Sequence, residues 1–271
     1  MKLVKRLLLP YYLAELLWYP IWFIVCHKAG YLQYLWYWGK IDPLDAFTAI
    51  FIGNGNYWCL ILGQLWFLPA LLFAEIIFVA LYNRLKKIDW KIFLAAIFLA
   101  SIGFNVVLPM GIDIAFVSQI FILAGILIRK NNFVDKISVT SCVVLMLMVV
   151  FAFCFNVGVD MNLRRYGDPI LFYMGGLAGT VLLMKISTLM TRGKIFSLIS
   201  SCGRQSMMIL VLHPIIANVL YEIFARATNF PPEDFFKEPP IILAVTMTGT
   251  LIPLFIARRF GKLPVLRVFC T

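Results

Sequence analysis

Runs of about 20 mostly apolar residues recur along the 271-residue chain, and clusters of Lys and Arg separate them. A helix needs about 20 such residues to cross the hydrocarbon core of a bilayer. Hydrophobic residues make up 62% of the chain and charged residues only 14%, whereas soluble domains contain about 25% charged residues. Eight segments are candidate spans: 7–26, 58–82, 91–108, 112–128, 137–156, 169–191, 205–225 and 239–257. The sequence therefore predicts an all-α, polytopic transmembrane helix bundle of about eight spans, which forms one integral-membrane domain over residues 1–271.

The positions of the basic residues predict how these spans are oriented. If the N-terminus is cytoplasmic, 18 of the 24 Lys and Arg residues fall in inner segments and 6 in outer segments. Because cytoplasmic loops carry the excess of Lys and Arg, this bias predicts that both termini are cytoplasmic and that the protein lies in the cell (inner, cytoplasmic) membrane. The net charge of +11 does not indicate nucleic-acid binding, since the basic residues are divided among short clusters between apolar runs.

Three other features refine this picture. The N-terminus resembles a signal peptide, but its apolar region is long, contains Glu15 and has no small-residue cleavage site, so we interpret it as a retained anchor. The third and fourth spans are short, and V-L-P-M-G-I-D (107–113) predicts a tight turn or one bent hairpin between them. The larger loops, 27–57, 157–168 and 226–238, are predicted on the outer side; the first carries an aromatic belt at 31–40 and the last carries P-P-E-D.

Polar side chains inside the predicted spans are the candidates for chemistry, because an ionisable residue is costly there. Three of them each lie nine residues from an inner arginine, which is about 13 Å along a helix: Glu15, Glu75 and His213. Gln119 lies ten residues from Arg129, near the same depth. If their helices are neighbours, a glutamate would orient the imidazole of His213 and favour proton transfer. Lys185 lies close enough to the inner face to snorkel, and no role is assigned to it.

A purely structural use of these residues stays open. The two glutamates would then only form hydrogen bonds between helices. His213 precedes Pro214, which frees the carbonyl of Leu210 from its helical partner, so that a polar side chain would help to satisfy the kink. The chain contains no HExxH, GxSxG or P-loop motif, and its six cysteines show no metal-ligand spacing; we therefore predict no metal site and no zinc-protease, serine-hydrolase or nucleotide-hydrolysis activity.

Several stretches resemble the acyltransferase type 3 family of integral-membrane sugar O-acetyltransferases. They occur in the family's order: K-R-L-L-L-P-Y-Y-L (5–13), G-Q-L-W-F-L-P-A-L-L-F (63–73), V-L-P-M-G-I-D-I-A-F-V-S-Q-I-F-I-L-A-G-I-L-I-R-K (107–130) and C-G-R-Q-S-M-M-I-L-V-L-H-P-I-I (202–216). The resemblance implies transfer of an acyl group, commonly acetyl from acetyl-CoA, to a hydroxyl of a cell-envelope polysaccharide or glycolipid sugar. The donor would be cytoplasmic, and the acceptor, an envelope glycan or lipid-linked sugar, would often lie on the other side.

The resemblance and the composition of the outer loop together give the predicted substrate-binding residues. Within the resembling stretches these are Gln64, Trp66 and Gln119. In the 157–168 loop, hydrogen bonding and stacking to a sugar are expected of Asp160, Asn162, Arg164 and Tyr166, although a merely solvated loop is an equal alternative.

The chain also departs from the family pattern. Family members usually have ten spans, and their first helix carries an Arg and a His, which is the favoured acyl-transfer base. The resemblance here starts after that hairpin, so we expect an N-terminally truncated relative in which no residue matches that His. His27 lies in a different helix, at its outer end. Many relatives have His where this chain has Gln64, a neutral amide that cannot act as a base.

His213 is then the remaining candidate base, with Glu15 or Glu75 as its orienting acid, because acyl transfer to a hydroxyl needs a base to take the proton. Two alternatives stay open. The chain is a non-catalytic family remnant, or a subunit whose missing helices come from a partner chain. Otherwise it is a transporter or flippase of lipid-linked sugars, although transporters often show internal repeats and this sequence shows none.

Overall fold

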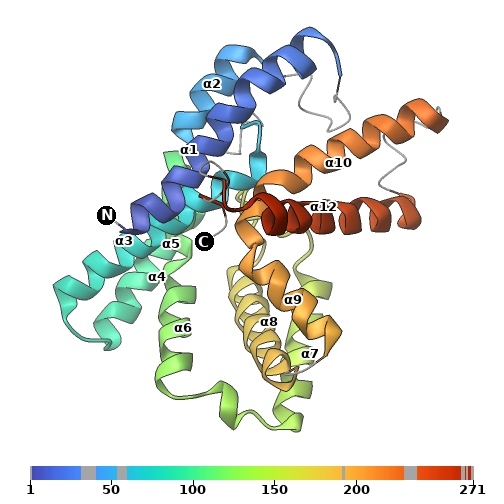
Figure 1. Ribbon diagram of the computed structural model, residues 1–271. Helices are drawn as coiled ribbons and strands as arrows, with labels where there is room; N and C mark the ends of the chain where they lie inside the picture. The colour runs from blue at the N-terminus through green and yellow to red at the C-terminus, as the bar shows by residue number, and fades with distance from the viewer. Residues whose placement is uncertain are drawn as a thin grey trace. The chain divides into compact units, whose positions relative to one another are not determined.

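The computed structural model describes residues 2–31, 41–53, 60–190, 193–228, 237–263, 266 and 268–269. Within these ranges every regular element is helical, apart from one isolated β-bridge between Asp160 and Arg165 (Figure 1). The prediction of an all-α protein is therefore confirmed. The predicted aromatic belt at 31–40, apart from Tyr31, and the P-P-E-D stretch lie outside the described residues.

The described α-helices follow the predicted apolar segments. They are α1 (Lys2–Trp22), α2 (Pro43–Ile52), α3 (Phe67–Leu85), α4 (Trp90–Asn105), α5 (Ile112–Val117), α6 (Gln119–Lys130), α7 (Val139–Phe155), α8 (Pro169–Leu189), α9 (Lys194–Arg204), α10 (Ser206–Thr228) and α12 (Pro239–Phe260). A π-helical turn, η1 (Phe23–Lys28), extends α1, and short 3₁₀ turns are η3 (Gly63–Trp66), η4 (Pro109–Gly111) and η5 (Val134–Lys136).

The lengths of these helices show a multi-pass membrane protein. Among the described residues, five helical segments are long and apolar enough to cross a bilayer, and α5 with α6 is a sixth candidate, bent by 50°. The apolar helices α4 and α7 are shorter, with 16 and 17 residues. Each of the eight predicted segments thus contains an apolar helix, while the number of complete crossings and the side of each terminus stay predictions.

Many large apolar side chains are exposed on the surface of the described helices, as expected for helices that face lipid. On α7, for example, Val139 is 83% exposed and Phe153 is 80% exposed. A contiguous face of this kind would be an association site in water, but lipid tails are as apolar as these side chains, so a bilayer covers it at no cost.

The segment predicted as one span at 112–128 is broken in the structure. Helix α5 ends at Val117, and α6 begins at Gln119 after a bend of 50°. Two side chains at the bend donate to carbonyls of the preceding turn: Ser118 Oγ to Ile114 O at 2.8 Å and Gln119 Nε2 to Ala115 O at 2.8 Å. Such back-bonding competes with the regular helical ladder and bends helices. The tight turn predicted before this segment is confirmed as η4, with positive φ at Met110 and Gly111.

Two helices were not predicted. Helix α2 lies within the predicted outer loop 27–57, where Asp42 caps it by accepting from Leu44 N at 2.8 Å and Pro43 stands at the first helical position. Helix α9 precedes α10 and carries serine and basic residues on one side. Both helices are short, so a search for 20-residue apolar runs does not detect them.

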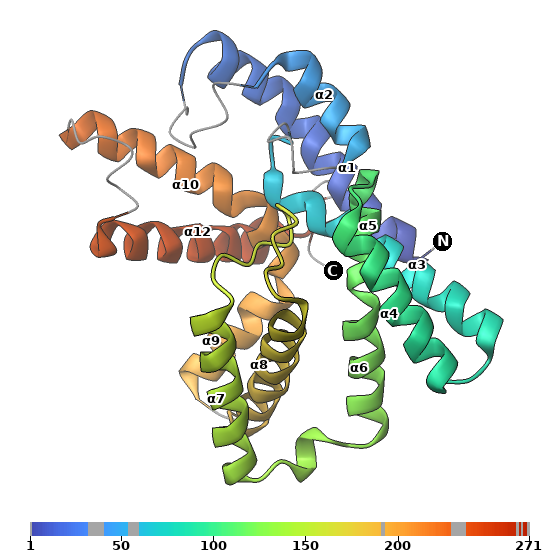
Figure 2. The ribbon, with the colours of Figure 1, turned by 180° about the vertical axis from the view of Figure 1, so that it is seen from behind.

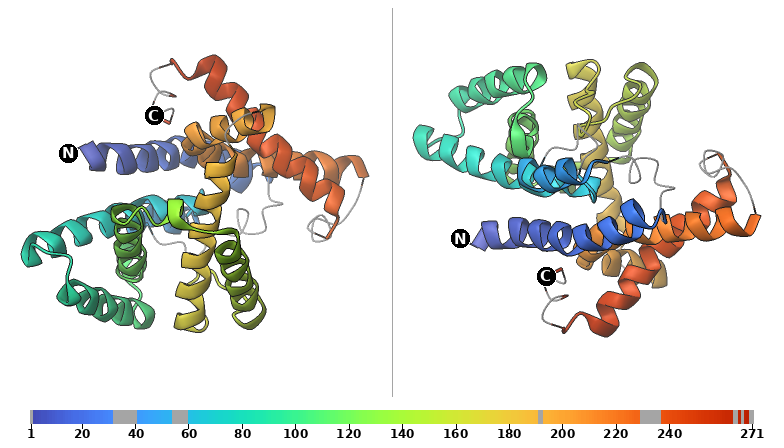
Figure 3. Two further views of the ribbon diagram at one scale, coloured as in Figure 1. Left: turned by 90° about the horizontal axis from the view of Figure 1, so that it is seen from below. Right: turned by 90° about the horizontal axis from the view of Figure 1, so that it is seen from above.

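The chain divides into two compact units, each described by itself. The first contains Met1–Pro69 and Ser197–Thr271, and the second contains Ala70–Phe196. In the first unit, α1 packs on α2, where Tyr11 Oη donates to Ile50 O at 2.8 Å, and α10 packs along α12 (Figures 1 and 2). In the second, α4 packs on α5 and α6, and α7 lies beside α8 in both views of Figure 3. The single-domain prediction for residues 1–271 stays a prediction.

Candidate active site

The core of the first unit contains a short irregular stretch at the predicted membrane depth, residues 60–66, which we call the linking segment. Its residues Leu60, Ile61 and Leu62 are at most 1% exposed and precede the 3₁₀ turn η3. Non-helical backbone inside a membrane must find partners within the protein. Glu15 provides one of them, because its Oε1 accepts from the backbone N–H of Leu62 at 3.2 Å. Glu15 therefore caps the N-terminal end of the η3–α3 helix, where a carboxyl group is favoured.

The second oxygen of Glu15 is not used by the described part of the protein. Glu15 is fully buried, and its Oε2 has no hydrogen-bond partner among the described residues. The residue was predicted to lie inside the membrane, and the structure places it in the interior of the unit. It thus offers one oxygen to the backbone and keeps a second, unpaired oxygen in the protein interior.

The linking segment also contacts α10 one turn before Pro214, a proline inside this helix. Pro214 has no N–H, so the carbonyl of Leu210 loses its helical donor. Gln64 supplies a replacement, since its Nε2 donates to Leu210 O at 3.1 Å. A polar side chain therefore satisfies this carbonyl as the sequence suggested, but the side chain is Gln64 and not His213.

His213 makes a different contact. Its Nδ1 lies 2.9 Å from Ile209 O. A carbonyl oxygen only accepts, so Nδ1 must carry the proton and donate. In the neutral imidazole this leaves the lone pair on Nε2, which is the tautomer that a general base needs.

A cavity lies along the α10–α12 pair and includes His213 in its wall. Its volume is about 350 Å³. The wall is mostly apolar, with Cys202, Ser206, Ile209, Leu210, His213 and Ala217 on the α9–α10 side and Val245, Thr246, Gly249 and Thr250 on α12. Gly249 faces His213, because a Cβ placed there would lie 3.6 Å from His213 Cβ. His213 thus borders a space large enough for part of a substrate.

In the described part of the chain, Glu15 and His213 are connected indirectly, because residues 60–66 contact both Glu15 and the helix that carries His213. Glu15 binds the backbone of this segment at Leu62, and Gln64 binds α10 one turn before His213. Within the described ranges, no hydrogen bond or ion pair joins Glu15 to His213 directly, since each has a backbone partner of its own. Trp66 ends η3, is half-buried and meets the ring of Phe67 edge-on, with ring centroids 6.1 Å apart.

The other two residues of the predicted polar layer lie in the second unit. Gln119 is fully buried, and its Nε2 donates to Ala74 O of α3 at 3.1 Å as well as to Ala115 O. Glu75, the residue after Ala74, is half-buried on α3. Gln119 therefore lies against the backbone beside Glu75, and its Oε1 has no partner in the described part of the chain.

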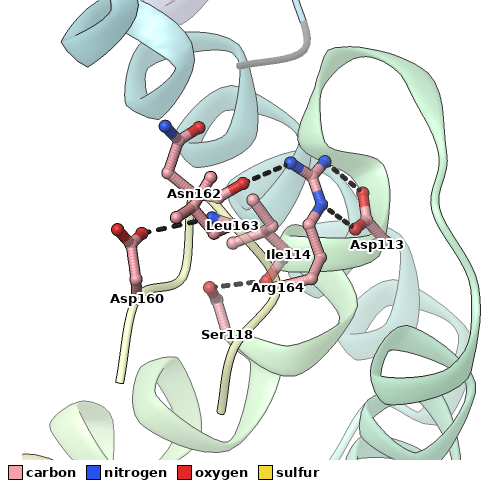
Figure 4. Close-up of polar contacts among 7 residues, drawn as sticks. All are labelled: Asp113, Ile114, Ser118, Asp160, Asn162, Leu163 and Arg164. Carbon is pink, nitrogen blue, oxygen red and sulfur yellow. Dashed lines mark hydrogen bonds and ion pairs between the residues drawn. The ribbon is translucent and has the colours of Figure 1, made fainter. Parts of the chain in front are cut away.

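The predicted outer loop is folded rather than merely solvated, and Arg164 holds it. Arg164 Nε lies 2.7 Å from Asp113 Oδ2, and Nη2 lies 3.1 Å from Asp113 Oδ1 (Figure 4). The third nitrogen, Nη1, donates to Asn162 O at 2.7 Å. The side chains of Arg164 and Asp113 are 8% and 0% exposed. Each of the three guanidinium nitrogens thus helps to fix the loop on the first turn of α5, and the pair with Asp113 has the bidentate geometry that Arg provides.

A second cavity lies beside part of this loop, and Asp160 and Asn162 are not among its described lining residues. Asp160 Oδ1 accepts from Leu163 N at 3.1 Å, and Asn162 Oδ1 is buried with no partner among the described atoms. Tyr166 is 4% exposed and packs between Phe104 and Phe172. Burial, followed by the nearby Asp113 carboxylate, raises the pKa of the Tyr166 hydroxyl, so this group stays protonated at neutral pH. A cavity of about 510 Å³ opens beside Arg164, Arg165 and Tyr166.

The sequence analysis did not identify two carboxylates that form ion pairs with arginines, Asp113 and Glu222. Asp113 lies in the quoted V-L-P-M-G-I-D turn, but its partner Arg164 is 51 residues away and no local pattern announces the pair. Glu222 lies inside the predicted span 205–225 and pairs with Arg226 at 2.6 Å. The spacing of four residues on a helix was a usable signal for this second pair.

Comparison with known proteins adds one match. The sequence model of a family described as an acyltransferase domain matches residues 1–258 of this chain. No curated protein and no solved structure gives a significant match.

Proposed function

Because this chain belongs to the acyltransferase 3 family, whose sequence model spans residues 1–258, we propose that it is a membrane-bound O-acyltransferase that uses His213 as its base. The donor is an acyl-CoA, in the simplest case acetyl-CoA. The acceptor is a hydroxyl of a cell-envelope polysaccharide or glycolipid sugar. The observation that carries the assignment of His213 is the contact of its Nδ1 with Ile209 O, which in the neutral imidazole leaves the lone pair on Nε2, in a residue of the cavity wall.

The reaction then follows from the roles of a general base. Nε2 of His213 takes the proton of the acceptor hydroxyl while the hydroxyl oxygen attacks the thioester carbonyl. The tetrahedral intermediate collapses as its C–S bond breaks, and the protonated imidazole returns the proton to the departing sulfur. The products are the O-acyl ester and CoA with a free thiol, so no oxidant, reductant or metal ion is consumed.

Gln64 and Glu15 act in this proposal as positioning residues. Gln64 binds the carbonyl of Leu210 in α10, one turn before His213. Glu15 binds the backbone of Leu62, in the segment that carries Gln64. The unpaired Oε2 of Glu15 favours it as the acid partner that stabilises the charged imidazole during turnover. Glu75 and Gln119 belong to the second unit. Glu75 is kept as the alternative orienting acid, and Gln119 is kept as a candidate for contacts to the substrate.

The outer loop is proposed to receive the acceptor. The cavity beside Arg165 and Tyr166 supports this, because it combines an exposed cation with an aromatic ring, and sugars bind by hydrogen bonds and stacking. Asp160 and Asn162 belong to the same loop and stay candidates for polar contacts to the acceptor, although they do not line the cavity. Arg164 would then act indirectly, by holding the loop against Asp113.

A transfer assay tests the proposal directly. The full chain is reconstituted in lipid with envelope glycan, and label from acetyl-CoA is followed into the glycan. We expect His213→Gln to lower the initial rate by about 10²- to 10⁴-fold, the usual contribution of a general base. His27→Gln is the matched control: its ring is exposed and stacks on Phe23, so the rate should not change.

The outcomes separate the open alternatives. Equal rates for the wild type and His213→Gln would reject His213 as the base. A wild-type chain that transfers no label alone but does so with a second membrane chain would identify it as a subunit. Uptake of a lipid-linked sugar into vesicles without any acyl transfer would favour the transporter.

A further inference from the structure

The segments at the predicted inner end of the α10–α12 pair contain basic residues and no acidic ones. Arg204 lies just before α10, while Arg258 and Arg259 form the last turn of α12 and Lys262 follows it. No Asp or Glu occurs in residues 197–221 or 239–271. The charge at this end is therefore not neutralised by the segments that carry it.

Arg204 and Arg258 are carried by different helices. Arg258 lies nine residues after Gly249, which faces His213, so it is about 13 Å farther along α12. Arg204 is the last residue of α9, and α10 begins at Ser206, so the turn between these helices separates Arg204 from the helix that carries His213.

Neutral hydroxyl groups of α9 hold both guanidinium groups. Arg204 Nη1 donates to Ser200 Oγ at 2.7 Å, and Arg258 Nη2 donates to Ser201 Oγ at 2.7 Å. Ser200 and Ser201 are adjacent, so the two arginines meet on one turn of the same helix. A hydroxyl orients a guanidinium without cancelling its charge, and four of the five N–H donors of each arginine stay available for an anion.

The cavity of about 350 Å³ is lined by Cys202 and Ser206, which stand on either side of Arg204 in the sequence, and by His213 farther along α10. Arg204 and Arg258 are not among its described lining residues, so they would meet a ligand that extends beyond the end of the cavity. An elongated ligand that fits such a path has an anionic head, a flexible arm and a reactive group at its far end. An acyl-CoA has this form: phosphate groups at one end, the pantetheine arm in the middle and the thioester at the other end.

We infer that Arg204 and Arg258 bind phosphate groups of the acyl-CoA donor, with the pantetheine arm in the cavity and the thioester at His213. This inference rests on the proposed acyltransferase function. Arginine suits this task because its fork of N–H donors matches phosphate oxygens, and charge-assisted bonds of this kind are strong. Ser200 and Ser201 are positioning residues, since they hold the two arginines and touch no substrate.

Equilibrium binding tests the inference without requiring turnover. The full chain is placed in nanodiscs of uncharged phosphatidylcholine, and binding of CoA is measured. We expect Arg258→Gln and Arg204→Gln each to raise the Kd for CoA about tenfold or more, and added salt to weaken wild-type binding. Arg129→Gln is the matched control, since Arg129 is an exposed basic residue at the end of α6; its Kd should equal that of the wild type.

A second arm distinguishes CoA from a lipid headgroup, which offers the same phosphate chemistry. Pantetheine, which lacks the phosphates, should bind the wild type and Arg258→Gln equally weakly. Nanodiscs with phosphatidylglycerol should leave CoA binding nearly unchanged. If this lipid abolishes CoA binding, or if the arginine variants lose affinity for the lipid alone, the site belongs to the membrane surface and the inference is overturned.

The outcomes also separate this inference from the proposed function. Normal CoA binding by both arginine variants would overturn the inference even if acyl transfer proceeds. A wild type that binds no CoA would overturn it as well. A wild type that binds CoA through these arginines but transfers nothing would uphold the donor site and reject the catalytic proposal. Ser201→Ala gives a further check, because loss of orientation alone should weaken CoA binding less than Arg258→Gln does.

Discussion

The orientation of His213 depends on Gln64, because both side chains bind backbone carbonyls of α10 next to Pro214. Gln64 donates to the carbonyl that Pro214 frees, and His213 stands next to that proline with Nδ1 on Ile209 O. The position of the imidazole therefore depends on an amide that belongs to the linking segment. A substitution at Gln64 should act on both stability and activity, although Gln64 carries no base.

Gln64→Met tests this dependence, because methionine keeps the length of the side chain but has no donor. The carbonyl of Leu210 would lose its partner, and we expect a loss of about 1 kcal/mol in the free energy of unfolding. Thermal unfolding in detergent gives the measurement. Gln205→Met is the control, since Gln205 Oε1 already lacks a partner within the described residues; a similar loss in both variants would contradict the role of Gln64.

The sequence predicted that Glu15 and Gln119 are buried, but it did not predict which groups they bind. The burial of Glu15 and Gln119 follows from their depth within apolar runs, and the structure places both at 0% exposure. Their partners are backbone groups of distant segments, Leu62 and Ala74. A single sequence contains no pattern that pairs residues 45 or more positions apart, so those contacts were beyond prediction.

At the scale of the elements, the turn before α5 requires a glycine, because Gly111 packs closely against Ala70 of α3. Gly111 has a φ of 67°, and a Cβ at this position would lie 2.8 Å from Ala70 Cβ. The left-handed conformation and the close approach both require glycine. The sequence predicted this turn from Pro109 and Gly111, but not the bend at Ser118, because side-chain back-bonding there leaves no apolar or glycine signal.

Gly111→Ala should therefore be destabilising by about 1–3 kcal/mol, the usual cost of backbone strain. Gly125→Ala in α6 is the control, since a Cβ there meets nothing within 4 Å and alanine is the better helix former. We expect this variant to be neutral or up to about 1 kcal/mol more stable. Unfolding by heat compares the two, and equal stabilities would show that the turn tolerates a side chain.

The outer loop depends in the same way on one ion pair. Because Arg164 and Asp113 are buried, Arg164→Gln or Asp113→Asn alone leaves one charge unpaired and should cost about 3–5 kcal/mol. The double variant removes both charges and should lose less than the sum of the two. Arg165→Gln, an exposed neighbour, should change stability by less than about 0.5 kcal/mol. Additive losses in this double-mutant cycle would refute a coupled pair.

At the scale of the whole molecule, the orientation in the membrane rests on the distribution of charge. With the N-terminus inside, 18 of the 24 basic residues lie on the inner side, and Arg204 and Arg258 of the proposed donor site are among them. Two predicted spans are short: α4 has 16 residues and α7 has 17, which is about 24–25 Å along the helix axis and less than the hydrocarbon thickness of about 30 Å. A short helix still crosses if the bilayer thins or flanking residues snorkel.

Reporter fusions decide whether α7 crosses. We expect a fusion after Lys130, at the end of α6, to be active as a cytoplasmic reporter, and a fusion after Arg165, beyond α7, to be active as an outer-side reporter. The reason is that Arg129, Lys130 and Lys136 give the loop before α7 more basic residues than Arg164 and Arg165 give the loop after it. If both fusions report the same side, α7 is a re-entrant helix, the parity of every later span reverses, and Arg258 would face the side without acyl-CoA.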